Sequence, residues 1–151
     1  MKLWLLRHGE AEPYQAQDAE RQLTDRGRAQ VMQAADVLQG VRLDAVIASP
    51  YVRAQQTADI VLEQLRYPEA AHIAPWLTPE KSVVDAPGHI EAYGVEHILL
   101  IGHQPLLGNL ASWLCDGTQQ GTPLGTGSLF CLEGDCLVGA MQLVLSHHAS
   151  C

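Results

Sequence analysis

The chain has 151 residues, of which 47% are hydrophobic and 17% are charged. This composition excludes a disordered protein, and the length fits a single domain over residues 1–151. No apolar run approaches the roughly 20 residues that span a bilayer, and no signal peptide follows Met1, so we expect a cytoplasmic protein without a membrane segment. The net charge of −8 argues against nucleic-acid binding but is compatible with a local anion site.

Four cysteines occur late in the chain, without a C-x-x-C pair. They predict free thiols in a reducing compartment rather than a disulfide or zinc framework. The adjacent His147 and His148 resemble half of a metal site, but neighbouring side chains point in different directions and no third ligand is evident. We therefore expect no metal and no other cofactor. The cysteines are Cys115, Cys131, Cys136 and Cys151.

Apolar runs that end in polar residues predict the strands of a parallel sheet. The predicted strands are residues 3–6, 43–48 and 97–101, with a further short strand at 72–74. The first of them leads directly into Arg7, His8 and Gly9, and the strand at 97–101 leads into Gly102 and His103. Two strands thus deliver a histidine and a glycine to their carboxyl ends.

Apolar residues at helical spacing predict helices between these strands. Thr24 is placed to cap the first helix and Gly40 to end it, while Pro105 and Gly117 bound the last. The polar segment 13–22 predicts a surface loop beside His8. The other predicted helices are residues 51–65 and 83–93, with a loop over 76–80.

The end of the chain predicts an antiparallel hairpin at the edge of the sheet. Residues 128–132 and 140–145 are rich in β-forming side chains and flank a turn, whereas the tail 146–151 carries no core signal. The alternation of strands and helices before this hairpin is typical of an α/β protein. We expect a three-layer sandwich with a mostly parallel mixed sheet and an antiparallel edge.

Four side chains are expected to converge, because the carboxyl ends of parallel strands lie along one edge of a sheet. They are Arg7, His8, Arg53 and His103. Arginine offers a planar fork of donors that matches phosphate oxygens, and histidine is a nucleophile that is partly neutral near physiological pH. Arg53 falls in the first turn of a helix, where a cation is unfavourable unless it faces a bound anion. The pattern therefore predicts a phosphate site.

The motifs resemble the histidine phosphatase superfamily, which has the phosphoglycerate-mutase-like fold. Residues 6–10 match its Arg-His-Gly signature, residues 49–58 its Ser-Pro-x-x-Arg-Ala-x-x-Thr-Ala segment, and Gly102-His103 its second histidine. Leu23-Thr24-x-x-Gly27 fits as well. The short length and residues 102–108 are most similar to small phosphohistidine phosphatases of the SixA type.

This resemblance implies a two-step phosphoryl transfer without a metal ion. His8 is then the nucleophile, and Arg7, Arg53 and His103 bind the phosphoryl oxygens, with His103 protonated and His8 neutral. Larger members of the family use a carboxylate as the general acid, and here Glu80 is the only reasonable candidate. The implied substrate is phosphohistidine on a protein partner, such as a histidine phosphotransfer domain or a phosphocarrier protein.

Several alternatives stay open at this stage. The same scaffold serves phosphatases and mutases of small phosphate esters, and a noncatalytic phosphate-binding module would keep the same pocket. Arg53 could instead pair with Asp25 or another carboxylate, and His103 could only cap the helix that begins near Pro105. The chain has no insertion long enough to form a lid, so we expect an open site that suits a protein surface.

Overall fold

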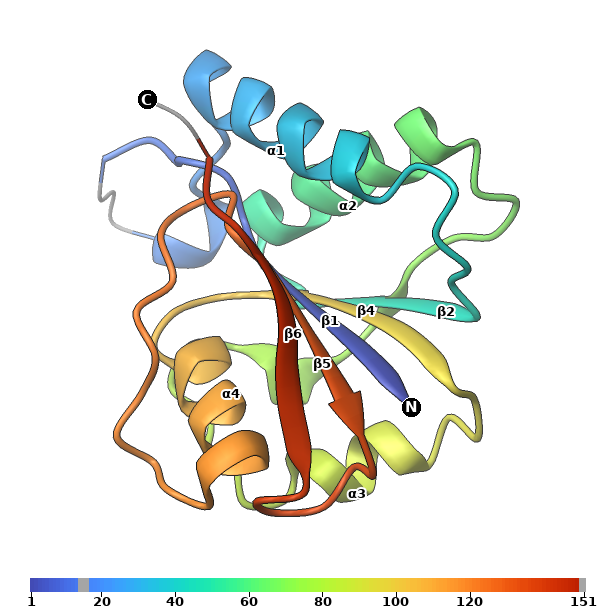
Figure 1. Cartoon of the computed structure of the whole chain (residues 1–151). Helices are drawn as coiled ribbons and strands as arrows, with labels where there is room; N and C mark the ends of the chain where they lie inside the picture. The colour runs from blue at the N-terminus through green and yellow to red at the C-terminus, as the bar shows by residue number, and fades with distance from the viewer. Residues whose placement is uncertain (14–16, 150–151) are drawn as a thin grey trace.

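The computed structural model describes residues 1–13 and 17–149, which form a six-stranded sheet between two layers of helices (Figure 1). The strand order is β3-β2-β4-β1-β5-β6. Strands β1, β2, β3 and β4 are mutually parallel, whereas β5 and β6 are antiparallel to their neighbours. The predicted mixed sheet with an antiparallel edge is therefore confirmed. The strands are β1 Lys2–Arg7, β2 Ala45–Ala48, β3 His72–Ile73, β4 His97–Gly102, β5 Leu129–Gly134 and β6 Met141–His147.

The register of the central strands sets the position of the histidines. In the parallel pair of β1 and β4, Arg7 lies opposite Gly102. The residues that follow, His8 and His103, therefore leave the sheet side by side at one edge. β2 ends at the same edge, because its last residue, Ala48, pairs with Ile101.

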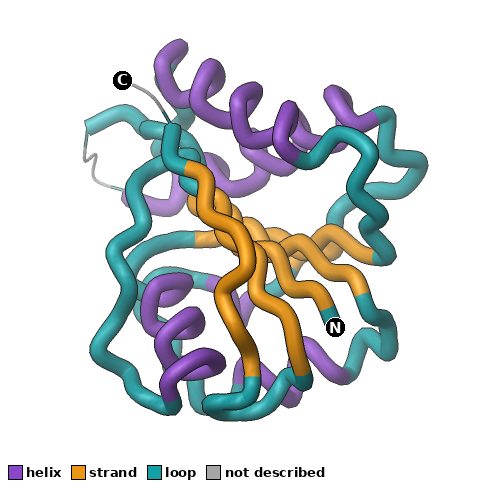
Figure 2. The backbone as a smooth tube through the Cα atoms, in the orientation of Figure 1, coloured by secondary structure: helices purple, strands orange, loops and turns teal. Residues whose placement is uncertain are grey.

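Helices α1 and α2 cover one face of the sheet, and α3 and α4 cover the other, as the tube in Figure 2 also shows. The predicted cap is confirmed, since the hydroxyl of Thr24 accepts a hydrogen bond from the backbone N–H of Gly27 (3.0 Å). None of the described helices is long and apolar enough to cross a membrane. The helices are α1 Asp25–Val37, α2 Val52–Leu65, α3 Ala86–Glu91 and α4 Leu106–Asp116, with short 3-10 helices η1 Asp18–Glu20 and η2 Pro75–Leu77.

Each face of the sheet has its own hydrophobic core, because successive strand side chains point to opposite sides. In β1, Leu3 and Leu5 belong to the core under α3 and α4, while Trp4 and Leu6 belong to the core under α1 and α2. All four are buried, and each large aliphatic side chain contributes about 1.5–3 kcal/mol on burial. Strand β1 is thus held from both sides, which fixes the residues at its end.

Three expectations differ from the structure in detail. The helix expected over residues 83–93 is confined to Ala86–Glu91, because Pro87 stands in its first turn and Gly94 takes a left-handed φ of 67° after it. The loop expected over 76–80 begins with the 3-10 turn of η2. Strand β6 extends into the expected tail as far as His147, which pairs with Leu129.

The cysteines that the structure describes are free thiols, as predicted. Cys131 and Cys136 are buried, and burial is the main reason that the pKa of each thiol is raised to about 11. Both are therefore protonated and act as small apolar core residues. Cys151 lies outside the described residues.

Candidate active site

Two glycines bring the loop after β1 into direct contact with the first turn of α1. A Cβ atom at Gly9 would clash with the carbonyl group of Gly27, and a Cβ atom at Gly27 would clash with the carbonyl oxygen of Glu10. Each position therefore needs the absence of a side chain rather than an unusual φ angle. The resulting contact fixes the backbone next to His8.

The hydrogen bonds of His8 define which of its ring nitrogens can react. Nδ1 lies 2.7 Å from the carbonyl oxygen of Gly9. A carbonyl oxygen only accepts, so we assign the proton to Nδ1, which donates it to Gly9. The lone pair is then on Nε2, where it accepts a hydrogen bond from the Nε–H of Arg53 (3.3 Å). Nε2 is thus the nucleophilic atom of this side chain.

His8 is uncharged in the folded protein. The side chain is buried, and its pKa is lowered to about 3. Burial is the largest cause, the hydrogen bond to Gly9 acts in the opposite direction, and the neighbouring Arg53 and Arg7 also lower the pKa. A neutral imidazole keeps its lone pair at any physiological pH. The expectation that His8 is neutral agrees with this geometry.

Arg53 pairs with a carboxylate, as one alternative from the sequence allowed, but the partner is Asp18 and not Asp25. Its guanidinium donates to the backbone carbonyl of Asp18 (2.8 Å) and to the Oδ2 atom of the same residue (3.2 Å). The other carboxylate oxygen of Asp18 accepts from Nε of Arg21 (2.8 Å). These contacts leave Arg53 only 3% exposed.

The guanidinium of Arg7, next to His8 in the chain, has one N–H donor without a described partner. One terminal nitrogen donates to the carbonyl oxygen of Leu124 (3.0 Å). Among the residues that the structure describes, its buried Nε–H has no partner. Burial and the nearby Arg53 both lower the pKa of the guanidinium, which means that the site disfavours the positive charge as long as no anion is present. An unpaired buried donor of this kind indicates a place for an acceptor from a ligand.

His103 lies against His8, with the two ring centroids 5.0 Å apart. Its Nε2 atom is 2.7 Å from the hydroxyl oxygen of Ser49, whereas the buried Nδ1 has no partner within the described part of the chain. The pKa of His103 is lowered to about 2, mainly by burial and in addition by His8, Arg53 and Arg7. His103 is therefore neutral in the protein without a ligand, and its protonation around a bound phosphoryl group stays a prediction. The sequence could not reveal this, because it does not show burial.

Glu80 lies at the periphery of this group. Its side chain is exposed, and its Oε1 atom accepts a hydrogen bond from the hydroxyl of Thr78 (2.8 Å) instead of contacting either histidine. The ring of Tyr51 lies 5.0 Å from that of His103. Burial raises the pKa of Tyr51, and the charge of Glu80 contributes to the shift, so the carboxylate is near enough to act electrostatically.

Three contributors to this site were not identified from the sequence, namely Asp18, Arg21 and Tyr51. The first two stand in a polar loop without apolar periodicity, which gives no signal of what they contact. Tyr51 lies within the Ser-Pro-x-x-Arg segment, and its ring packs 5.0 Å from the guanidinium carbon of Arg53. Its place next to that motif is the one sequence signal that could have indicated it.

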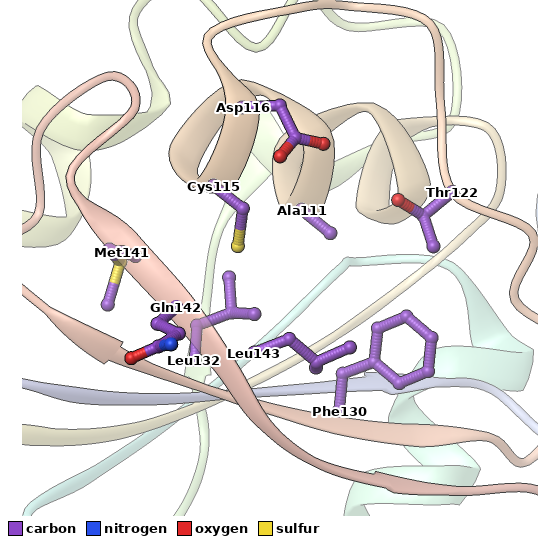
Figure 3. Close-up of a pocket in the computed structure, with 9 residues that line it drawn as sticks. All are labelled: Ala111, Cys115, Asp116, Thr122, Phe130, Leu132, Met141, Gln142 and Leu143. Atoms are coloured by element: carbon purple, nitrogen blue, oxygen red, sulfur yellow. The ribbon is translucent and has the colours of Figure 1, made fainter.

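A separate cavity of about 320 Å³ lies between α4 and the hairpin of β5 and β6 (Figure 3). Its walls include Phe130, Leu132 and Met141, and the thiol of Cys115 faces them from α4. Burial and the adjacent Asp116 raise the pKa of Cys115, which keeps the thiol protonated and weakly nucleophilic. The cavity is lined by none of the residues around His8, and its thiol is a weak nucleophile. We therefore place the candidate active site at the strand ends and not in this cavity.

The fold and the site define an α/β protein with two arginines and two neutral histidines at the carboxyl edge of its sheet, an arrangement suited to an oxyanion. The family model of the histidine phosphatase superfamily (branch 1) matches residues 3–76. Phosphohistidine phosphatase SixA of Escherichia coli (strain K12) is 36% identical over 122 residues, which cover 78% of this chain and 76% of that protein. The chain belongs to the histidine phosphatase superfamily.

Two further comparisons agree with this assignment. The SixA homolog of Haemophilus influenzae is 32% identical over 126 residues, covering 76% of this chain and 77% of that protein. The solved structure of the protein histidine phosphatase SixA complexed with tungstate has a TM-score of 0.87 and 31% identity, and the match covers 97% of this chain and 96% of that one. The phosphoglycerate-mutase-like sandwich expected from the sequence is thereby confirmed.

Proposed function

We propose that the protein is a phosphohistidine phosphatase that acts on a phosphohistidine of a partner protein through a covalent intermediate on His8. The observation that carries this proposal is the Nε2 atom of His8, whose lone pair faces Arg53 in a buried site. Two buried donors without described partners, Nε of Arg7 and Nδ1 of His103, accompany it. A phosphoryl group satisfies these donors and meets the nucleophile at once.

In the first step, Nε2 of His8 attacks phosphorus in line while the phosphorus–nitrogen bond to the substrate imidazole breaks. The electron pair of that bond goes to the leaving imidazole nitrogen, which takes up a proton from water or from Glu80, the candidate general acid. Arg7, Arg53 and His103 stabilise the charge on the three equatorial oxygens. Because a bound dianion favours positive charge nearby, it raises the pKa of His103 from its low value in the free site.

In the second step, water attacks phosphorus, the bond to Nε2 breaks, and inorganic phosphate leaves. His8 is thereby restored in its neutral form. Neither step changes an oxidation state, so the reaction needs no redox partner. We propose that it also needs no metal ion, because guanidinium groups supply the charge stabilisation that a metal would otherwise provide.

Two observations favour phosphohistidine over a phosphate ester as the substrate: the position of the candidate general acid, Glu80, and the names of the similar proteins. Glu80 is exposed and hydrogen-bonded to Thr78, which makes it a weakly placed general acid. An imidazole leaving group needs less help than an alkoxide, because it is far less basic. Two relatives whose alignments cover most of the chain are named phosphohistidine phosphatase SixA and phosphohistidine phosphatase SixA homolog.

A comparison of substrates tests this proposal. The purified protein should dephosphorylate a phosphohistidine-bearing phosphotransfer domain or phosphocarrier much faster than sugar phosphates. A strong preference for the sugars would instead assign it to the phosphatases or mutases of small esters. Binding of inorganic phosphate without turnover of any phosphoryl donor would identify a noncatalytic module.

The role of Glu80 has its own test. Glu80→Gln should slow hydrolysis of an alkyl phosphate more than that of phosphohistidine, and Glu63→Gln on the exposed side of α2 is the matched control. Equal losses on both substrates would contradict the argument from the leaving group. The cytoplasmic location stays a prediction, which cell fractionation would test.

A further inference from the structure

Ser49 connects the end of β2 to His103. Its backbone is fixed on both sides, because its N–H donates to the carbonyl of Ile101 (3.0 Å) and its own carbonyl accepts from the side chain of Gln55 (2.7 Å). The residue is 0% exposed. Its hydroxyl oxygen lies 2.7 Å from Nε2 of His103 and accepts a hydrogen bond from the N–H of Tyr51 (3.3 Å). The hydroxyl is thus held against one nitrogen of the imidazole.

The number of donors and acceptors decides which atom carries the proton. The N–H of Tyr51 occupies one lone pair of the Ser49 oxygen, and the O–H of Ser49 needs an acceptor of its own in a site without exposure. Of the partners described for this hydroxyl, only Nε2 of His103 can accept. The O–H therefore donates to Nε2, and the proton of the neutral imidazole resides on Nδ1.

We propose that Ser49 is a positioning residue that keeps a proton on Nδ1 of His103, so that this atom donates to an oxygen of the phosphoryl group. The opposite tautomer would place a lone pair at Nδ1, which repels a phosphoryl oxygen. A hydroxyl can also reverse its role. If His103 takes up a proton from the medium beside a bound anion, Nε2–H donates to the Ser49 oxygen, and Nδ1 keeps its proton.

The surroundings of His103 are consistent with a donor at Nδ1. Burial lowers the pKa of the ring, and the other groups that lower it are His8, Arg53, Arg7 and Arg21. All three arginines offer N–H donors. Arg7 keeps a buried Nε–H without a partner in the described part of the chain, whereas Arg53 and Arg21 are paired with Asp18. A proton on Nδ1 adds one more donor to this set without adding a charge.

The inference rests on the proposed function for the role of His103, whereas the tautomer itself can be measured without activity. The experiment records two-bond ¹H–¹⁵N spectra of the ¹⁵N-labelled, ligand-free protein at pH 7.5, with His103 assigned by its absence in His103→Gln. We expect a protonated Nδ1 and an unprotonated Nε2 in the natural sequence. In Ser49→Ala we expect the Nε2–H tautomer to become detectable. A natural protein with its proton on Nε2 would overturn the proposal.

Kinetics supply the second readout. Because the loss of one well-placed donor affects the transition state more than the bound substrate, Ser49→Ala should lower kcat about tenfold and leave KM nearly unchanged. Ser49→Thr, which keeps the hydroxyl, should recover most of kcat. Ser112→Ala is the matched control, since Ser112 is a buried serine of α4 that binds backbone groups only.

The outcomes separate the two proposals. A Ser49→Ala protein with unchanged kcat and the same tautomer as the natural protein would refute the role of Ser49, whatever the substrate is. An active His8→Ala protein would instead refute the covalent mechanism, and the tautomer result would still stand.

Discussion

The burial of two neutral histidines predicts that the protein loses stability below about pH 6.5. The pKa of His8 is about 3 and that of His103 about 2 in the folded protein, and the ordinary value of 6.5 applies to each in the unfolded chain. Between these values the unfolded chain binds more protons than the native one, so the free energy of unfolding decreases as the pH falls. At pH 5 the loss is about 2 kcal/mol for each histidine, or about 4 kcal/mol together.

Urea titrations at pH 7, 6 and 5 in a buffer without phosphate test this prediction. The natural protein should lose about 4 kcal/mol between pH 7 and pH 5, and His8→Gln and His103→Gln should each lose about half as much. The double variant should show almost no dependence on pH in this range, which makes it the internal control. A natural protein equally stable at pH 7 and pH 5, or single variants with its full loss, would refute the reasoning.

Three further substitutions test the support of the site. Gly27→Ala should lower the free energy of unfolding by about 3 kcal/mol and the thermal midpoint by roughly 6–12 °C, whereas Gly88→Ala, with nothing within 4 Å of the new Cβ, should raise stability slightly. Thr24→Ala should lower the free energy of unfolding by about 1 kcal/mol in a urea titration, and Thr24→Ser should leave it almost unchanged. A Thr24→Ala protein as stable as the natural one would show that the cap is dispensable. Asp18→Asn should tighten vanadate binding about fivefold, because it removes the negative charge that competes with the anion for Arg53. Weaker binding would contradict this competition.

The arrangement of the main site residues could be predicted because it follows from local patterns and one rule of topology. Apolar runs locate the strands, and parallel strands present their carboxyl ends at one edge. Arg7, His8 and His103 follow such runs directly, and Arg53 follows β2 after a short turn. The structure brings these four residues together, as expected.

The remaining features depend on contacts that no local pattern encodes. Asp18 meets Arg53 across 35 residues, and Ser49 meets His103 across 54, while neither Asp18 nor Ser49 has a periodicity that points to its partner. The protonation of His103 is a property of burial and of neighbouring charges, which a family motif does not specify. The sequence therefore predicts which side chains converge better than it predicts their hydrogen bonds and charges.

The most direct test of the central claim is to trap the phosphoryl-enzyme intermediate. The protein is quenched during turnover of a ³²P-labelled phosphohistidine substrate, and the labelled atom is identified by peptide mapping and ³¹P NMR. The account predicts one labelled residue, His8, phosphorylated on Nε2, and no label in His8→Ala. A label on another residue or on Nδ1 of His8, or full turnover by His8→Ala, would contradict it.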